Sequence, residues 1–169
     1  MNFAEYNVKD ANLEEVLLAL KSLDTVEAVA LGGSRSTGAN DENSDYDIYV
    51  YCSEIPTGET RENLLEKYCS IAEFGNHYWE SEDNTVMNNG TPVDIIYREI
   101  DRFSGYIDTV IKGGKAFNGY TTAFWHNIKN SKVLFDKTGS FTKFRDMAQI
   151  DFPENLRRSI IKNNRNLLN

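Results

Sequence analysis

Apolar residues recur at helical spacing near the start of the chain, over residues 12–23. A helix there would collect them on one face, as amphipathic helices do, and that face holds Leu13, Val16, Leu17, Leu20 and Leu23. Asn12 is expected to cap the helix, and Glu15, three residues later, completes a capping-box pattern. The segment therefore predicts a helix that packs one side against a core.

Shorter segments have the composition of strands, because β-branched and aromatic residues dominate them and turn residues bound them. The first is mostly apolar and ends at a glycine pair. The predicted strands are 25–31, 46–52, 76–80, 92–98 and 132–136, of which the last is short and expected at a sheet edge. Asn89-Gly90 is a tight-turn signal between the third and the fourth.

The remaining periodic segments are predicted to be helices. One spans 60–74, with Leu64, Leu65, Tyr68 and Ala72 on its inner face. After residue 100 the pattern is mostly helical, over 101–112, 121–130, 140–150 and 152–168, with Pro153 at the first position of the last helix. We therefore predict an α/β (α+β) fold in which helices flank a small, mixed, twisted sheet and a helical segment follows it.

The last predicted helix reaches the end of the sequence without a stop signal. A helix of this kind needs a surface to pack on. We expect the chain to be the front part of a longer protein, or to pack against another subunit, for example as a homodimer.

Composition narrows the class of protein. A chain of 169 residues with 40% apolar residues can bury a core as one domain, or as one domain and a fragment of a second. Its net charge is −8, whereas nucleic-acid-binding proteins usually carry an excess of basic residues, so a nucleic-acid partner is not expected. The two cysteines and two histidines have no zinc-ligand spacing. No signal peptide or bilayer-spanning stretch is evident, so we expect a cytoplasmic protein without a membrane partner.

Candidate chemistry lies on the predicted strand 46–52 and just before it. Side chains alternate between the faces of a strand, so Asp45 and Asp47 share one face with Tyr49 and Tyr51, while Tyr46, Ile48 and Val50 share the other. Two neighbouring carboxylates repel each other unless a cation lies between them. Their hard oxygen ligands suit Mg²⁺, which binds few carboxylates together with water and substrate phosphates.

A third carboxylate and a glycine-serine turn extend this pattern. Asp94 interrupts an otherwise apolar strand, where a charge is costly unless it is paired or bound to a metal. The turn at Gly32-Gly33-Ser34 would let backbone N–H groups approach a phosphate closely, and the serine hydroxyl adds a donor. Together these features favour phosphoryl or nucleotidyl transfer, in which positioning and charge neutralisation dominate.

The motif that runs from Gly33-Ser34 through Asp45-Tyr46-Asp47 to Asp94 resembles that of the nucleotidyltransferase superfamily of the DNA polymerase β type. The longer sequence over residues 33–51 resembles the corresponding sequences of small bacterial members of this superfamily. These members include the aminoglycoside and lincosamide adenylyltransferases. The resemblance is good over residues 24–97 and loose elsewhere. It implies that residues 1–100 form the catalytic domain. Residues 101–169 would be a helical extension, the start of a C-terminal helical domain.

The resemblance also implies roles for individual residues. Gly33 and Ser34 would hold the nucleotide phosphates, with Arg35 and Ser44 as further contacts. Asp45 and Asp47 would bind two Mg²⁺ ions, and Asp94 would help bind metal and act as, or assist, a base. The substrate would be ATP or another nucleoside triphosphate.

The acceptor stays open at this point. One hypothesis is adenylylation of a hydroxyl on an antibiotic-like small molecule, with which the acidic charge agrees. A second is an antitoxin-type or protein-modifying nucleotidyltransferase that acts on a partner protein. A third is a nucleotide-binding module without turnover, which the third carboxylate at Asp94 disfavours.

Several other features have simpler interpretations. The segment 112–119 is not a P-loop, since Ala116 follows Lys115, and we predict a helix cap and turn there. The acidic run 80–84 is expected in a solvated loop, and Arg157-Arg158 on an exposed helix face.

In the predicted strand 76–80, either His77 and Trp79 or Tyr78 and Glu80 would face the core, with Glu80 as an alternative general base. Aromatic residues expected mainly in the core are Tyr97, Phe103, Tyr106, Phe117, Tyr120, Phe124 and Trp125.

Overall fold

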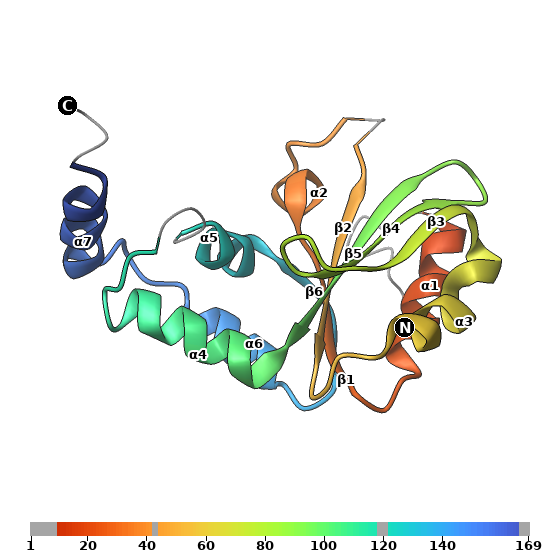
Figure 1. Cartoon of the computed structure of the whole chain (residues 1–169), viewed down its shortest axis with the longest axis horizontal. Helices are drawn as coiled ribbons and strands as arrows, with labels where there is room; N and C mark the ends of the chain where they lie inside the picture. Colours follow the sequence, from red (N-terminus) through yellow and green to blue (C-terminus); the bar gives the residue numbers. More distant parts are fainter. Residues whose placement is uncertain (1–9, 42–43, 118–121, 166–169) are drawn as a thin grey trace.

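The computed structural model describes residues 10–41, 44–117 and 122–165. Within these ranges a mixed sheet has the strand order β3-β4-β5-β2-β1-β6 (Figure 1). Its strands are β1 (Val26–Leu31), β2 (Tyr46–Cys52), β3 (Cys69–Asn76), β4 (Ser81–Met87), β5 (Pro92–Glu99) and β6 (Lys132–Asp136). The central pair β2 and β5 is parallel, and the other neighbouring strands are antiparallel. This arrangement confirms the predicted fold class.

Two helices, α1 (Ala11–Lys21) and α3 (Gly58–Leu65), cover one face of the sheet (Figure 1). The apolar face predicted for the first helix is confirmed, because Leu13, Val16, Leu17 and Leu20 are buried and Leu23 packs against them. Its predicted cap is wrong. Asp10 is the cap, since its Oδ1 accepts hydrogen bonds from the N–H groups of Asn12 (3.0 Å) and Leu13 (3.3 Å). The helix starts earlier than the apolar pattern does, so Asn12 lies inside its first turn.

The second predicted helix is half wrong. Helix α3 ends at Leu65, a 3₁₀ turn (Glu66–Tyr68) follows, and residues 69–74 belong to β3. Ala72, expected on the inner helix face, is exposed on that strand. Residues 69–74 therefore form a strand that pairs with β4, although their apolar residues also have helical spacing.

The predicted strand 76–80 and the predicted loop 80–84 exchange roles. After Asn76, residues 77–80 form the turn between β3 and β4, with His77, Tyr78 and Trp79 all exposed, so neither expected pair enters the core. The acidic run lies largely in β4, where Asp83 is fully buried. Polar residues occupy both faces of β4, and this hides its alternation from a search for apolar periodicity. The turn at Asn89-Gly90 exists as predicted and joins β4 to β5.

The other face of the sheet is covered by α4 (Ile100–Ile111), α5 (Ala123–Asn130) and α6 (Ser140–Met147), all close to prediction (Figure 1). The final helix, α7 (Glu154–Asn164), lies at the far end of the molecule, with Pro153 as its N-cap rather than its first residue. The segment after residue 100 also supplies the predicted edge strand β6, which pairs with β1. The division of the chain near residue 100 stays a prediction.

The predicted aromatic core is largely present. Tyr97 is buried on the face covered by α1 and α3, and Phe103 and Trp125 are buried on the other face. Tyr106, Phe117 and Phe124 are partly buried against the cluster that contains Phe103 and Trp125. Tyr120 lies outside the described residues. After α4, the N–H of Gly114 donates to Val110 (3.0 Å) at a positive φ of 63°, which confirms the predicted cap and turn as far as residue 117.

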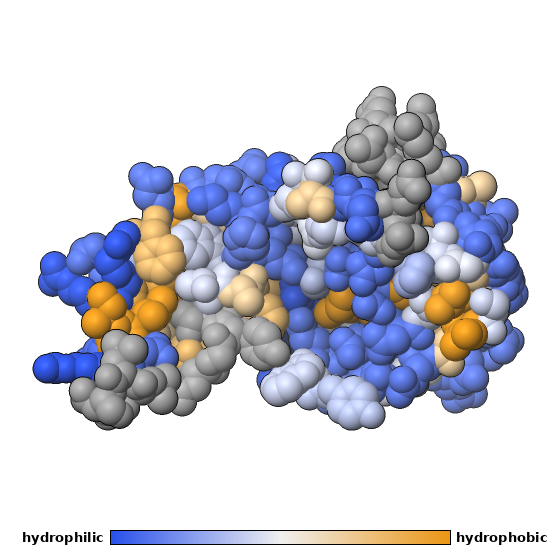
Figure 2. All heavy atoms as spheres, turned by 90° about the horizontal axis from the view of Figure 1, so that it is seen from above, coloured by the Kyte–Doolittle hydropathy of each residue, from blue (hydrophilic) through white to orange (hydrophobic). Residues whose placement is uncertain are grey.

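The molecular surface is mainly polar. Seen from above, hydrophilic residues cover most of the visible face and apolar side chains gather only in small groups (Figure 2). Arg157 and Arg158 are exposed on α7, as predicted. None of the helices in the described ranges has the length and apolar character needed to cross a bilayer.

Candidate active site

The sheet sets two of the three predicted carboxylates side by side. Strands β2 and β5 run parallel in a register that places Asp47 opposite Asp94, so both side chains lie on the same face of the sheet. Asp45 precedes Asp47 by two residues and is exposed, whereas Asp47 and Asp94 are half-buried. Further along the same face, Tyr49, Tyr51 and Ile96 are buried beneath α4, α5 and α6. The carboxylates therefore lie where this helical layer leaves the sheet accessible.

The Asp47 carboxyl lies beside two like charges. Burial, together with the negative charges of Asp45 and Asp94, raises the pKa of the Asp47 carboxyl from 3.8 to about 6. A bound cation would remove this repulsion, so the donor set fits a hard divalent ion. In the part of the chain that the structure describes, no group of three or more histidine, cysteine or acidic side chains is assembled closely enough to hold a metal ion.

The glycine-serine turn presses against Asp47. Gly33 has a positive φ of 58°, and a Cβ atom added to it would lie 1.7 Å from Asp47 Oδ2. A Cβ atom added to Gly32 would lie 2.3 Å from Tyr49 Cε2. The N–H of Gly32 also donates to the carbonyl of Asp47 (2.8 Å). Only glycine at both positions lets the turn and the carboxylate strand approach this closely.

The other predicted phosphate contacts have partners within the protein. Arg35 Nε donates to the carbonyls of Ser44 (3.0 Å) and Asp45 (2.9 Å), Arg35 Nη2 donates to Ser44, and the guanidinium stacks 4.0 Å from the ring centre of Tyr46. The Ser44 hydroxyl donates to Asp41 Oδ1 and accepts from the Asp41 N–H, both at 3.0 Å. In this structure Arg35 therefore ties α2 (Gly33–Thr37) to the start of β2. The phosphate contacts of Arg35 and Ser44 stay predictions.

A scan against protein families matches the nucleotidyltransferase domain over residues 13–117, which is more than half of the chain. The chain belongs to the nucleotidyltransferase domain family. This confirms the predicted superfamily and the predicted class of enzyme, while the antibiotic-type subgroup stays a prediction. A comparison with curated proteins gives no match.

Two solved structures are similar to this nucleotidyltransferase. One is the crystal structure of a toxin–antitoxin with AMP-PNP, at 15% identity, with 92% of this chain and 94% of that chain covered and a TM-score of 0.47. The other is Cid1 in complex with its short product ApU, at 16% identity, with 66% of this chain and 39% of that chain covered and a TM-score of 0.40.

A cavity of about 710 Å³ opens beside the turn of the nucleotidyltransferase motif, between α2 and α5. Gly33, Ser34 and Thr37 line one side, and residues of α5, including His126 and Asn130, line the other. Within the described residues the Ser34 hydroxyl has no hydrogen-bond partner. The cavity is large enough for a nucleotide and adjoins the carboxylates through Gly33.

Glu80, the alternative base, is engaged elsewhere. Both of its carboxylate oxygens accept hydrogen bonds from Arg98 (2.7 Å each), and Arg98 is itself buried among the rings of Tyr49, Phe103 and Phe124. This bidentate pair makes Glu80 a structural partner of Arg98 rather than a base for the acceptor.

Two residues that sequence reasoning missed lie nearer to the acids. Asn84 on β4 stands opposite Asp94, and its Nδ2 donates to Asp94 Oδ1 (3.0 Å). Glu82, on the same face of β4, has its pKa raised by burial and by neighbouring acids, Asp94 first among them. Correct limits for β4 would have placed both residues on the face opposite the buried Asp83, but their closeness to Asp94 follows only from the pairing of β4 with β5.

Proposed function

We propose that this nucleotidyltransferase transfers AMP from ATP to a hydroxyl group of a small molecule of the aminoglycoside type. The observation that carries the proposal is the register of β2 and β5, which sets Asp47 beside Asp94 next to the Gly33-Ser34 turn and its cavity. The acceptor oxygen would bond to the α-phosphorus as the bond to the bridging oxygen breaks. Pyrophosphate leaves, and the hydroxyl proton passes to Asp94 or to water.

Asp45, Asp47 and Asp94 would hold the metal, for which we propose two Mg²⁺ ions. When bound, Mg²⁺ neutralises phosphate charge and makes the acceptor hydroxyl more acidic. Because Mg²⁺ takes substrate phosphates among its ligands, the nucleotide would complete a site that the carboxylates begin. The raised pKa of Asp47 agrees with a site prepared for added positive charge.

Gly33 and Ser34 would contact the phosphates, and the cavity between α2 and α5 would take the nucleoside. Ser34 lines this cavity with a hydroxyl that has no partner in the described residues, so it can donate to a phosphate oxygen. Arg35 and Ser44 would act mainly by holding the start of β2, with phosphate contacts as their further predicted role. In this proposal residues 1–100 carry the chemistry and residues 101–169 form one wall of the nucleotide site.

The charge around Asp94 favours a cationic acceptor. Burial raises the pKa of Glu82, and the charges of Asp94, Glu80 and Glu73 raise it too, so several carboxylates face the same region. An acceptor that carries ammonium groups would lower this repulsion. The overall charge of −8 acts in the same direction at longer range.

A protein hydroxyl is the second candidate acceptor. Tyr78 and Trp79, 76% and 78% exposed at the β3–β4 turn, could contact a partner protein near the same face. An acceptor screen separates the two candidates, because a small molecule and a partner protein would be labelled as products of very different mass.

The first test is calorimetric titration of a non-hydrolysable ATP analogue with and without Mg²⁺. We expect Mg²⁺-dependent binding to the native chain and its loss in Asp45→Asn/Asp47→Asn, whereas Asp151→Asn, an exposed change elsewhere, should bind normally. Equal binding by the native chain and the double variant would refute the proposed site. Labelled ATP and a panel of aminoglycosides would then test the acceptor.

A further inference from the structure

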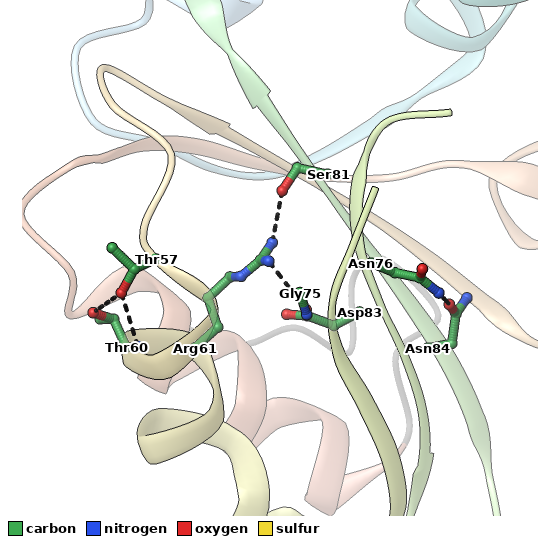
Figure 3. A network of polar contacts seen from close by, with 8 residues as sticks. All are labelled: Thr57, Thr60, Arg61, Gly75, Asn76, Ser81, Asp83 and Asn84. Atoms are coloured by element: carbon green, nitrogen blue, oxygen red, sulfur yellow. Dashed lines mark hydrogen bonds and ion pairs between the residues drawn. The ribbon is translucent and has the colours of Figure 1, made fainter. Parts of the chain in front are cut away.

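A line of two amides connects strand β3 to Asp94. Asn76 Nδ2, at the end of β3, donates to Asn84 Oδ1 on β4 (3.0 Å). Asn84 Nδ2 donates in turn to Asp94 Oδ1 on β5 (3.0 Å). Figure 3 shows Asn76 and Asn84 with their amides directed at each other across neighbouring strands. The line crosses three adjacent strands on the face that carries the carboxylates.

The carboxylate at the end of the line determines how both amides are turned. The Asn84 amide has a donor end and an acceptor end, and Asn76 occupies the acceptor end. If the Asn84 amide were reversed, its NH₂ would face the NH₂ of Asn76 and its oxygen would face the Asp94 carboxylate. The second contact is repulsive whichever way Asn76 is turned, because a carboxylate only accepts, so Asp94 selects the donor end of Asn84 and Asn76 holds the acceptor end in place.

The two strands that carry the amides are fixed from the opposite face. Arg61 on α3 and Asp83 on β4 are 1% and 0% exposed and form an ion pair of 3.5 Å. The Gly75 N–H donates to the same Asp83 oxygen (2.8 Å), and Arg61 Nη1 donates to Ser81 Oγ (2.9 Å) (Figure 3). Gly75 directly precedes Asn76, and Asp83 directly precedes Asn84. Each amide therefore follows a residue that is held on the buried side.

We propose that Asn84, held in place by Asn76, is a positioning residue for Asp94. It binds Oδ1 of the Asp94 carboxylate and so leaves Oδ2 to face the metal or the acceptor hydroxyl. The role of Asp94 in catalysis rests on the proposed function, but the orientation of its carboxylate by the two amides does not. Groups of this kind, which hold a ligand rather than the metal, commonly alter metal affinity strongly.

The test measures Mn²⁺ affinity by electron paramagnetic resonance in the presence of AMP-PNP. Asn84→Ala should weaken Mn²⁺ binding by about 10-fold, and Asn76→Ala by a smaller factor of about 3. Because Asn76 acts only through Asn84, the double variant should bind Mn²⁺ no more weakly than Asn84→Ala alone. Asn88→Ala is the matched control, since the Asn88 side chain bonds Lys67 in the turn beyond β4 and should leave Mn²⁺ binding unchanged.

A second measurement separates the amide line from the proposed function. In the metal-free chain, the side-chain NH₂ resonances of Asn84 should shift in both Asn76→Ala and Asp94→Asn but not in Asn88→Ala. If the native chain bound no Mn²⁺, the proposed function would fail while these resonances still decided the orientation. The positioning role would be overturned if the Asn84 resonances were the same in Asn76→Ala and Asp94→Asn as in the native chain. It would also be overturned if the losses of Mn²⁺ affinity in the two single asparagine variants added up in the double variant.

Discussion

Asp47 lies in an unfavourable electrostatic position. It is half-buried, and Asp45 and Asp94 both act on it with like charge, which together bring its pKa to about 6. The folded, metal-free chain therefore takes up a proton at Asp47 between about pH 4 and pH 6, where the unfolded chain stays ionised. Above pH 6 the charged Asp47 side chain therefore destabilises the folded chain. This destabilisation disappears as the pH falls toward 4.

Asp47→Asn should stabilise the metal-free protein at pH 7. The amide removes the repelled charge, so we expect the melting temperature to rise by about 2–6 °C at pH 7 and the gain to vanish near pH 4. Thermal unfolding of both proteins across this pH range, in the presence of EDTA, measures the difference. Asp151→Asn should show no such gain, and a native chain more stable than Asp47→Asn at pH 7 would contradict the argument.

Gly33 and Gly38 provide a matched pair of substitutions in the same short helix region. Both have positive φ, 58° and 77°, so alanine costs about 1 kcal/mol of backbone strain at either position. An added Cβ collides with Asp47 only at Gly33, because nothing lies within 4 Å of the one at Gly38. We expect Gly33→Ala to weaken binding of AMP-PNP with Mg²⁺ more than 10-fold, and Gly38→Ala to lower stability alone. Similar binding by the two variants would show that the close approach to Asp47 is unimportant.

The carboxylates and the glycine-serine turn were predictable because they are local signals. Alternation along one strand fixes the face of Asp47, Asp45 precedes it by two residues, and a charge in the apolar segment around Asp94 is an exception that needs a cause. Asn84 gives no local signal, since an asparagine between an aspartate and a threonine is typical of a loop. Its contact with Asp94 depends on which strands pair, and that is decided by the whole sheet.

At the scale of elements, the β3–β4 hairpin is where sequence reasoning failed. The predicted helix 60–74 extends into β3, because Leu64, Leu65 and Tyr68 continue a helical spacing that the chain abandons after Leu65. Strand β4 carries polar residues on both faces. On its buried face Asp83 is held by an ion pair, and Met87 is the apolar residue that enters the core. The strands β1, β2, β5 and β6 and the helices α1, α4, α5 and α6 bury apolar residues, and they were predicted close to their observed limits. The short helix α2 has no apolar residue and was expected only as a turn.

The ion pair beneath the hairpin gives a prediction about stability. Arg61→Met would leave the fully buried Asp83 without its cation, so we expect the free energy of unfolding to fall by about 3–5 kcal/mol. Urea unfolding measures this loss. Arg157→Met, which removes an exposed pair with Glu154, should cost less than about 0.5 kcal/mol.

A second substitution separates the lost ion pair from lost packing. Arg61→Met/Asp83→Leu should recover much of the stability, because it removes the buried charge together with its partner. A double variant as unstable as Arg61→Met would show that the guanidinium packing, and not the charge, is what matters.

At the scale of the whole molecule, the two sides of the sheet come from different parts of the sequence. Helices α1 and α3 precede residue 100, whereas α4, α5, α6 and strand β6 follow it. Buried Tyr49, Tyr51 and Ile96 depend on this later part for cover. The Trp125 indole on α5 donates a hydrogen bond to the Ala148 carbonyl at the end of α6 (2.8 Å). This bond joins two helices of the later part of the chain.

A chain that ends at residue 100 should therefore not fold as a stable unit. It keeps the three carboxylates but exposes one apolar face of the sheet, so we expect no cooperative unfolding transition in urea, in contrast to the full chain. Circular dichroism measures both. A cooperative transition in the shortened chain would instead show that residues 1–100 are an independent domain.

The parallel register of β2 and β5 has a consequence for how such an enzyme can change. Asp47 and Asp94 are neighbours in the sheet, yet the chain between them makes a long excursion through α3, β3 and β4. The turn at 77–80 lies at the tip of that excursion, away from the strand pairing that sets the carboxylates. A loop of different length or composition at this turn could change which acceptor binds beside the carboxylates. The positions of Asp47 and Asp94 would stay the same, because the strand pairing sets them. A library randomised at residues 77–79, which leaves Glu80 paired with the buried Arg98, is thus the natural place to seek new acceptors while the nucleotide chemistry is kept.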